Sequence, residues 1–213
     1  HISPEMSNLF KAVSEAGGDM AKVDASAFPV LNMLNTRYFI FPLQGGKTMP
    51  LQNPYTLGNA WFVDEVQYVN NANEEIDALH KVAPAKVAVV DKKFAELVKQ
   101  TAAPDSLSSV TLVAYEPNDL KYEVDSEKGG VVVFSEIYYP GWQAYIDGVE
   151  APHGRADYIL RAMNVPAGKH TVEFKFDPKS LHTTETIAFI ALGLLAVAVL
   201  LLLVLRGKAL CRS

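Results

Sequence analysis

The run IAFIALGLLAVAVLLLLVL occupies residues 187–205, nineteen residues without a single charge. As an α-helix rising about 1.5 Å per residue it would extend roughly 28 Å, close to the ~30 Å hydrocarbon core of a bilayer. A secretory signal would lie at the N-terminus, and a core helix that is apolar on all sides needs a large protein around it. The run therefore predicts a single transmembrane helix over residues 186–206.

The charges on the two sides of this run predict its orientation. Before it lie all 24 acidic side chains and 16 of the 19 Lys and Arg side chains, a net charge of −8, and Arg206, Lys208 and Arg212 follow it. Short cytoplasmic segments next to a span are rich in Lys and Arg. We therefore expect a basic cytoplasmic tail over 207–213 and an extracytoplasmic location for the residues before the span.

Cysteine content and the start of the chain add to this picture. The only cysteine, Cys211, falls in the expected tail, so the exported part would depend on a hydrophobic core instead of disulfides. The chain begins with His1 and carries no signal sequence. We therefore expect the C-terminal part of a longer, multi-pass membrane protein, whose upstream transmembrane bundle would be a partner of this region.

Composition also bears on ligands. The soluble part is acidic, whereas nucleic-acid binding needs a basic stripe, so no nucleic-acid partner is expected. The five histidines show no metal-ligand spacing and a lone cysteine cannot build a zinc site. We expect no metal and no cofactor.

The first half of the soluble part predicts mixed structure. Residues 1–24 read as a loosely ordered lead-in with a helix over 4–16, and residues 25–104 as a small mixed α/β portion. Residues 44–54 hold two glycines and two prolines and predict a loop. The expected elements of 25–104 are a helix capped by Ser26 and ending near Asn35, strands over 37–41, 60–69 and 86–90, a helix capped by Asn73 and ending near Val82, and a helix over 94–99.

Residues 105–178 predict an antiparallel, jelly-roll-like β-sandwich. Short apolar runs recur about every ten residues and are separated by turn signals such as Asp147-Gly148. The expected strands are 110–115, 121–125, 130–136, 142–146, 158–165 and 169–176. Asp177-Pro178 would end the sheet, and about eight residues would link it to the membrane. The fold class is therefore α+β, followed by a single C-terminal transmembrane helix.

Aromatic and charged residues concentrate in YYPGWQAYIDG (138–148) and HGRADY (153–158). Aromatic rings stack on the apolar faces of sugars, while Arg and Asp bind sugar hydroxyls. The predicted ligand contacts are Trp142, Tyr145, Arg155, Asp157 and Tyr158. The alternative is ordinary sandwich packing, with Trp142 and Tyr145 in the core and Arg155 and Asp157 in a local ion pair. No Ser-His-Asp, GxSxG or P-loop motif occurs, so no catalytic residue is identified.

Several segments resemble the C-terminal region of the YfhO family of bacterial membrane proteins. They are LNMLNTRYFI (31–40), GNAWFV (58–63), YYPGWQAYIDG (138–148), Arg161-Ala162 and VPAGKH (165–170). The terminal span fits as well, and the likeness runs from about residue 25 to the end.

The resemblance implies a polytopic GT-C-type glycosyltransferase in the bacterial inner membrane. Such an enzyme takes a sugar from a polyprenyl-phosphate donor on the outer face of the membrane and acts on cell-envelope glycans. Its catalytic acidic residue is expected in an early extracytoplasmic loop, so the resemblance assigns no catalytic residue to this sequence. The alternatives are a non-catalytic, membrane-anchored carbohydrate-binding domain and a structural domain that packs against membrane helices.

Overall fold

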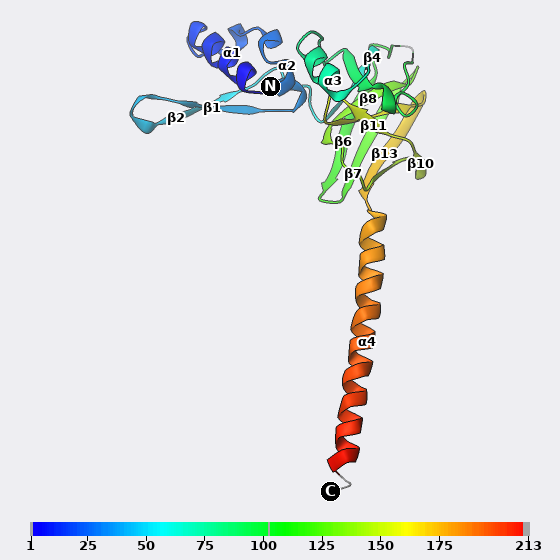
Figure 1. The fold of residues 1–213 in the computed structure, drawn as a ribbon. Coiled ribbons are helices and arrows are strands. Elements are labelled where there is room, and N and C mark those ends of the chain that lie inside the picture. The colour runs from blue at the N-terminus through cyan, green and yellow to red at the C-terminus, as the bar shows by residue number, and fades with distance from the viewer. Residues whose placement is uncertain (1, 102, 211–213) are drawn as a thin grey trace. The chain divides into compact units, whose positions relative to one another are not determined.

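An α+β arrangement of short helices and four sheets precedes one long apolar helix (Figure 1). The computed structural model describes residues 2–101 and 103–210. Its helices are α1 (Ile2–Glu15), α2 (Pro29–Met33), α3 (Ala72–Leu79) and α4 (Lys179–Leu210), with 3-10 turns η1 (Met20–Lys22), η2 (Ala25–Ala27), η3 (Gln44–Gly46) and η4 (Lys92–Phe94).

The strands form two small sheets and two larger ones. They are β1 (Tyr38–Pro42), β2 (Thr48–Gln52), β3 (Ala60–Val63), β4 (Glu65–Val69), β5 (Val87–Asp91), β6 (Ser109–Glu116), β7 (Asp119–Ser126), β8 (Gly130–Ile137), β9 (Trp142–Ile146), β10 (Val149–Ala151), β11 (Gly154–Ala156), β12 (Leu160–Val165) and β13 (Gly168–Phe176). The α+β class predicted from the sequence is confirmed.

The N-terminal helix is packed, not loosely ordered. Leu9 and Val13 of α1 are buried one helical turn apart and cluster with Phe28 and Phe39. The carboxylate of Glu5, also buried, accepts the backbone N–H groups of Val30 and Leu31 at 3.2 Å each. The helix expected over 4–16 is therefore confirmed, and it caps α2. The expected cap at Ser26 is wrong: Asp24 accepts the N–H of Ser26 instead.

The segment 44–54, expected to be a loop, contains a strand. β2 pairs antiparallel with β1, and the turn between them places Gly45 and Gly46 at φ +77° and +75°. Pro42 and Pro50 are tolerated because each strand of this two-stranded sheet has a free edge, where a missing N–H breaks no ladder hydrogen bond. Pro50 therefore does not mark a loop here, although prolines often do.

The strand expected over 60–69 is two strands in different sheets. The backbone turns at Asp64, where the N–H groups of Asp64 and Glu65 both donate to the carbonyl of Lys86. β3 then pairs with β8, whereas β4 pairs in parallel with β5. The helix expected over 94–99 is also wrong, since the 3-10 turn η4 ends at Phe94 and residues 95–97 form only a turn.

Two antiparallel sheets face each other from residue 109 to 176. One has the order β10-β9-β13-β7-β6 and the other β11-β12-β8-β3. Tyr122, Phe134 and Phe174 meet between them, with ring centroids 4.8 Å apart for Phe134–Phe174 and 4.9 Å for Tyr122–Phe134. Figure 1 shows β6, β7 and β13 side by side. The predicted β-sandwich is confirmed, although β3 joins it from before residue 104. The predicted domain boundaries stay predictions.

The chain divides into two units, residues 1–139 with 143–175 and residues 140–142 with 176–213. In the second unit the N–H of Asp177 donates to the carbonyl of Gly141 at 2.9 Å. Gly141 has φ +108°, and a Cβ there would lie 2.9 Å from Pro178. The position therefore requires glycine, both for its backbone conformation and for the close approach of the two segments.

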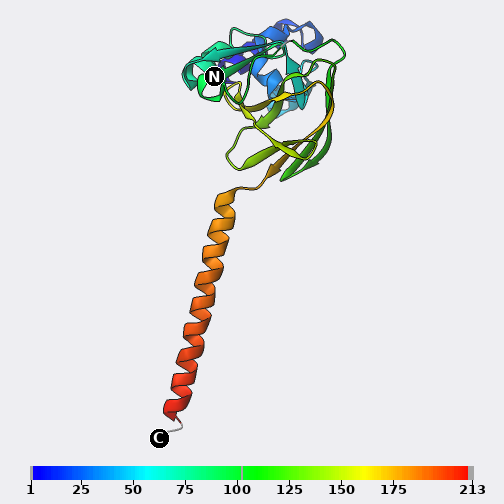
Figure 2. The ribbon, with the colours of Figure 1, turned by 90° about the vertical axis from the view of Figure 1, so that its right-hand side faces the viewer.

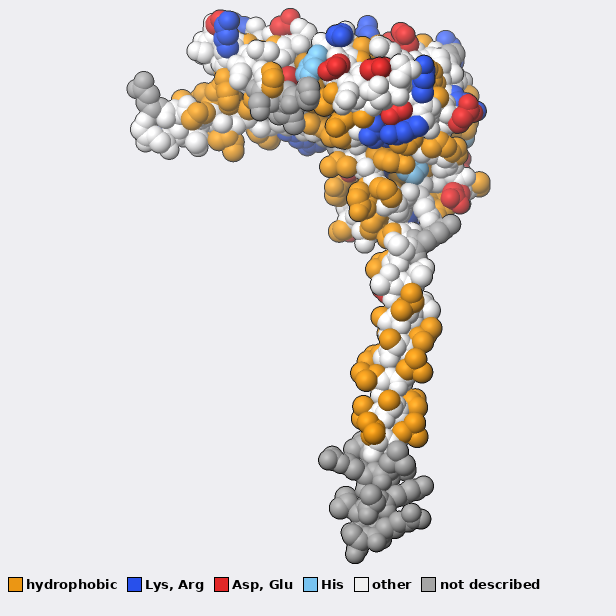
Figure 3. Space-filling model, in the orientation of Figure 1, with side chains coloured by type: hydrophobic (Ala, Val, Ile, Leu, Met, Phe, Trp, Pro, Cys, Tyr) orange, Lys and Arg blue, Asp and Glu red, His pale blue; other side chains and the backbone are white. Residues whose placement is uncertain are grey.

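α4 starts at Lys179, so the roughly eight residues expected between the sheet and the membrane are part of the same helix as the apolar run. Thr184 and Thr186 bond back to the carbonyls four residues earlier and continue the helix through this polar stretch. The helix runs without a break in both ribbon views (Figure 1 and Figure 2). Residues 180–202 are long and apolar enough to cross a membrane, and hydrophobic side chains line the visible face (Figure 3). Residues 211–213 of the predicted tail, with Cys211, lie outside the described residues.

Candidate functional site

The predicted contact residues lie on two different sheets. Trp142 and Tyr145 are on β9, in the five-stranded sheet, whereas Arg155 is on β11 and Asp157 and Tyr158 form the turn from β11 to β12 in the four-stranded sheet. Asp157 and Tyr158 have φ +50° and +71°. Left-handed backbone is uncommon for Tyr, so contacts around the turn must hold it in this conformation.

Asp157 holds the turn against the free edge of β5. Its N–H donates to the carbonyl of Val89 at 2.7 Å, and its Oδ1 accepts the N–H of Val89 at 2.8 Å. The side chain is completely buried. Asp157 therefore forms hydrogen bonds with both the N–H and the carbonyl of Val89, as a residue of a neighbouring strand would.

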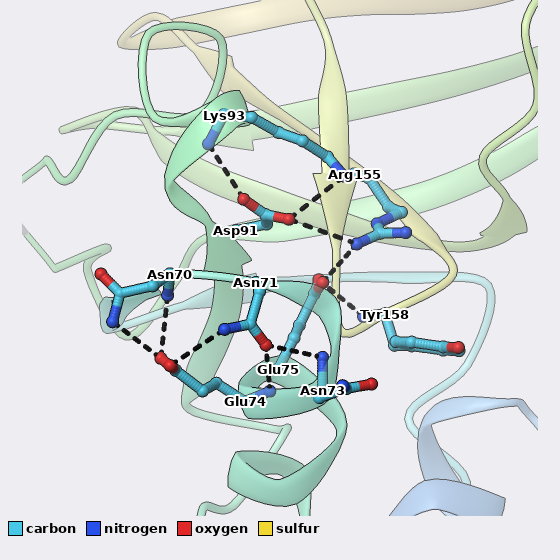
Figure 4. Close-up of polar contacts among 9 residues, drawn as sticks. All are labelled: Asn70, Asn71, Asn73, Glu74, Glu75, Asp91, Lys93, Arg155 and Tyr158. Atoms are coloured by element: carbon cyan, nitrogen blue, oxygen red, sulfur yellow. Dashed lines mark hydrogen bonds and ion pairs between the residues drawn. The ribbon is translucent and has the colours of Figure 1, made fainter.

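Glu75 of α3 joins the same turn. Its carboxylate accepts the N–H of Tyr158 at 2.9 Å and pairs with the guanidinium of Arg155 (Figure 4). Asp91 lies 3.9 Å from Arg155 and 3.1 Å from the ammonium of Lys93. Glu75 is fully buried and Arg155 keeps 18% of its side-chain exposure. The local ion pair of Arg155 with Asp157 considered from the sequence is thus replaced by pairs with Glu75 and Asp91.

Two aromatic rings cover the guanidinium of Arg155. Its central carbon lies 5.5 Å from the ring centre of Phe94 and 5.4 Å from that of Tyr158. Rings at this distance attract a cation and shield it from water. These contacts hold the guanidinium of Arg155 in one position, where it connects β11 to Glu75 of α3 and Asp91 of β5.

Capping explains how α3 turns Glu75 inward. Asn71 accepts the N–H groups of Asn73 and Glu74 at 3.0 Å each, and Glu74 bonds back to Asn70 (Figure 4). The cap is therefore Asn71, not the expected Asn73. Glu75 then shares the buried face with residues three and four positions later, Ala78 and Leu79. That spacing was the sequence signal that could have identified Glu75 as an inward-facing residue.

Trp142 and Tyr145 have different surroundings. Trp142 is half-buried with its ring 5.3 Å from that of Phe176. Tyr145 is half-buried too; its hydroxyl donates to Gln143 at 2.6 Å and its ring lies 5.5 Å from the ammonium of Lys175. Neither contact tests ligand binding, so the carbohydrate role of all five residues stays a prediction.

The chemistry of the cluster is electrostatic. Burial raises the pKa of Asp157 to about 7; the hydrogen bond from Val89 opposes this and the charge of Glu75 adds to it. Burial also raises the pKa of Glu75, against the effects of Tyr158 and Arg155. In the described part of the chain, no three His, Cys, Asp or Glu side chains are grouped to hold a metal ion. The arrangement is suited to joining structural elements.

Asp157→Asn tests this electrostatic account. A carboxyl whose pKa is raised on folding keeps its proton in the native state after the unfolded chain has lost it, so stability falls as pH rises. For Asp157 the window runs from about pH 4 to about pH 7, at up to about 1.4 kcal/mol per pH unit. Asn keeps the acceptor for Val89 and tolerates φ > 0. We expect Asp157→Asn to be more stable than wild type at pH 8 and to lose part of the pH slope, measured by urea unfolding in detergent.

The matched control is Asp147→Asn. Asp147 also has a left-handed backbone, φ +51°, but it is exposed and its pKa is lowered by the hydrogen bond to His170. This variant should gain no stability at pH 8. An unchanged pH slope in Asp157→Asn would contradict the account.

Comparison with known proteins supplies the family. A family description, bacterial membrane protein YfhO, matches residues 81–188, just over half of the chain. The matched range begins after α3 and includes β5, η4, the sandwich strands β6 to β13 and the first residues of α4. Neither the curated proteins nor the solved structures contain a significant match. The chain belongs to the YfhO family of bacterial membrane proteins.

Proposed function

We propose that this chain is the extracytoplasmic C-terminal region and last membrane span of a polytopic GT-C-type glycosyltransferase. The enzyme would take a sugar from a polyprenyl-phosphate donor and transfer it to a cell-envelope glycan in the bacterial inner membrane. The observation that carries the proposal is YfhO family membership over a β-sandwich that continues directly into a candidate span. Catalysis would belong to an acidic residue in another part of the protein.

In this proposal the sandwich binds the acceptor glycan. Tyr145 on the five-stranded sheet and Tyr158 on the turn of the four-stranded sheet, 36% exposed, each supply aromatic surface. Trp142 belongs to the other unit of the chain and is a separate candidate contact. Arg155 and Asp157 act by holding the turn that presents Tyr158, through Glu75 and Val89. Rings with two side-chain torsions bind at low entropic cost, which suits a weak, repeated contact with a polymer.

A structural domain that packs against membrane helices is the second candidate. The observation in its favour is that Arg155 and Asp157, the two charged members of the predicted set, contact other elements of the same chain. A domain whose charged residues stabilise its own fold can pack against membrane helices without binding sugar.

Envelope sugar content separates the two candidates. In a strain that lacks the gene, we expect the sugar substituents of an envelope polymer to fall, and wild-type protein to restore them. Tyr145→Ala should restore them severalfold less well at equal membrane levels, because it removes an aromatic contact at a half-exposed position. Glu96→Gln, at an 89% exposed side chain, is the control and should restore them fully. Unchanged sugar content in the deletion strain would contradict the enzyme, and full restoration by Tyr145→Ala would favour the structural candidate.

Cys211 offers a direct test of the proposed topology. It is the only cysteine of the chain, and a cytoplasmic tail would shield it from a membrane-impermeant maleimide in intact cells. We expect the peptide that carries Cys211 to be labelled only after the cells are permeabilised. Asn118→Cys, at an exposed turn between β6 and β7, should be labelled in intact cells. The reverse labelling pattern would overturn the orientation.

A further inference from the structure

A polar groove of about 450 Å³ lies on the five-stranded sheet, away from the turn that carries Arg155. Its lining combines hydroxyl, carboxylate and basic side chains from three adjacent strands and the loop after β9: Ser109, Thr111, Glu123, Asp125, Asp147, Lys169, His170 and Thr171. The backbone of the buried Val124 also contributes. The volume is in the range of small-ligand sites.

Strand register brings these side chains into rows. Glu123 of β7 stands opposite Thr111 of β6 and Thr171 of β13. Successive side chains of a strand point to opposite faces, and Val124 and Val172 are buried between the sheets. The row Thr111–Glu123–Thr171 therefore lies on the face directed away from the core, which we call the outer face.

Asp147 closes the groove beyond Thr171. Its N–H donates to the carbonyl of Thr171 at 2.9 Å, and its Oδ1 accepts the N–H of Thr171 at 2.8 Å. The other carboxylate oxygen lies 2.6 Å from Nδ1 of His170, whose second ring nitrogen lies 3.1 Å from the carbonyl of Ala167. These contacts fix the wall of the groove before any ligand arrives.

Some polar groups of the groove are already paired and others are not. The ammonium of Lys169 lies 2.6 Å from the carboxylate of Asp125, and Asp147 is paired with His170. Among the described residues, the Glu123 carboxylate and the hydroxyls of Thr111 and Thr171 form no hydrogen bond within the protein, and the charge of Glu123 only adds to the effect of Asp125 in raising the pKa of Lys169. An acceptor between two hydroxyls on a shaped surface matches the vicinal hydroxyls of a sugar.

We propose that this groove binds a neutral, hydroxyl-rich glycan, with Glu123 as the principal acceptor and Thr111 and Thr171 as flanking contacts. This inference rests on the function proposed above and assigns its acceptor contact to a specific surface. Three carboxylates face one lysine and one histidine, so an anionic sugar is repelled. The chemistry therefore selects neutral saccharides over uronic acids.

Tyr145 extends the same face. Thr171, Glu173 and Lys175 alternate along β13 onto the outer face, and the ring of Tyr145 lies beside the ammonium of Lys175. Tyr145 is thus the one residue of the predicted set that both lies on the five-stranded sheet and points to the face with the groove. A glycan longer than one sugar can reach from Glu123 towards that ring.

Saturation-transfer NMR on the full chain in detergent micelles tests the groove. The probes are maltose, lactose and N,N′-diacetylchitobiose as neutral disaccharides, and digalacturonic acid as the anionic comparison. We expect a neutral probe to bind, Glu123→Gln to weaken it at least tenfold and Thr171→Val severalfold, with digalacturonic acid weaker than the neutral probe. Both substitutions keep side-chain size, and thermal unfolding checks that the fold is retained. Glu96→Gln should bind as wild type does.

Three other results would contradict the proposed glycan binding, each in a different respect. Neutral binding that survives Glu123→Gln and Thr171→Val would place the glycan elsewhere and leave the proposed function standing. Equal or tighter binding of digalacturonic acid would overturn the charge selection. No binding of any probe by wild type would overturn the groove, while the proposed function would still be judged by envelope sugar content.

Discussion

The ion pair between Glu75 and Arg155 is the contact on which the arrangement of the elements before α4 depends. It joins α3, which connects the parallel strands β4 and β5, to β11 at the edge of the four-stranded sheet. Glu75 is fully buried, so removing one partner would leave a charge in an apolar surrounding, at a cost of about 3–5 kcal/mol. The left-handed turn at Asp157 and Tyr158 and the hydrogen bonds to Val89 and Glu75 form around this pair.

The Glu75–Arg155 contact changes the role that we assign to the HGRADY segment (153–158). From its composition it resembles a ligand-binding loop, with a cation, a carboxylate and a ring in four residues. In the structure the cation and the carboxylate face other elements of the chain, and Tyr158 covers the cation. The outer face of the five-stranded sheet instead leaves Glu123 with hydroxyls on both sides. The same β-sandwich therefore carries the buried Glu75–Arg155 contact on one sheet and a separate polar surface on the other.

Much of the fold followed from local sequence patterns. The alternation of Val172 and Phe174 with polar residues identified β13, and β9 was predicted at its observed bounds, Trp142–Ile146. The errors in the strands depended on how strands pair in the folded chain, whereas the caps expected at Ser26 and Asn73 were wrong by only two residues. Pro50 lies in β2 because that sheet has only two strands, and β3 separates from β4 because Lys86 accepts both N–H groups at the break. The spacing of Glu75 from Ala78 and Leu79 indicates that it faces inward, but its partner Arg155 lies eighty residues later and no local pattern contains it.

A double-mutant cycle on Glu75 and Arg155 tests the central claim most directly. The free energy of unfolding would be measured in detergent for wild type, Glu75→Gln, Arg155→Met and the double variant. If the pair joins the two parts of the fold, the double variant should be less destabilised than the sum of the single variants, by about 2 kcal/mol or more. Additivity within about 0.5 kcal/mol would contradict the account.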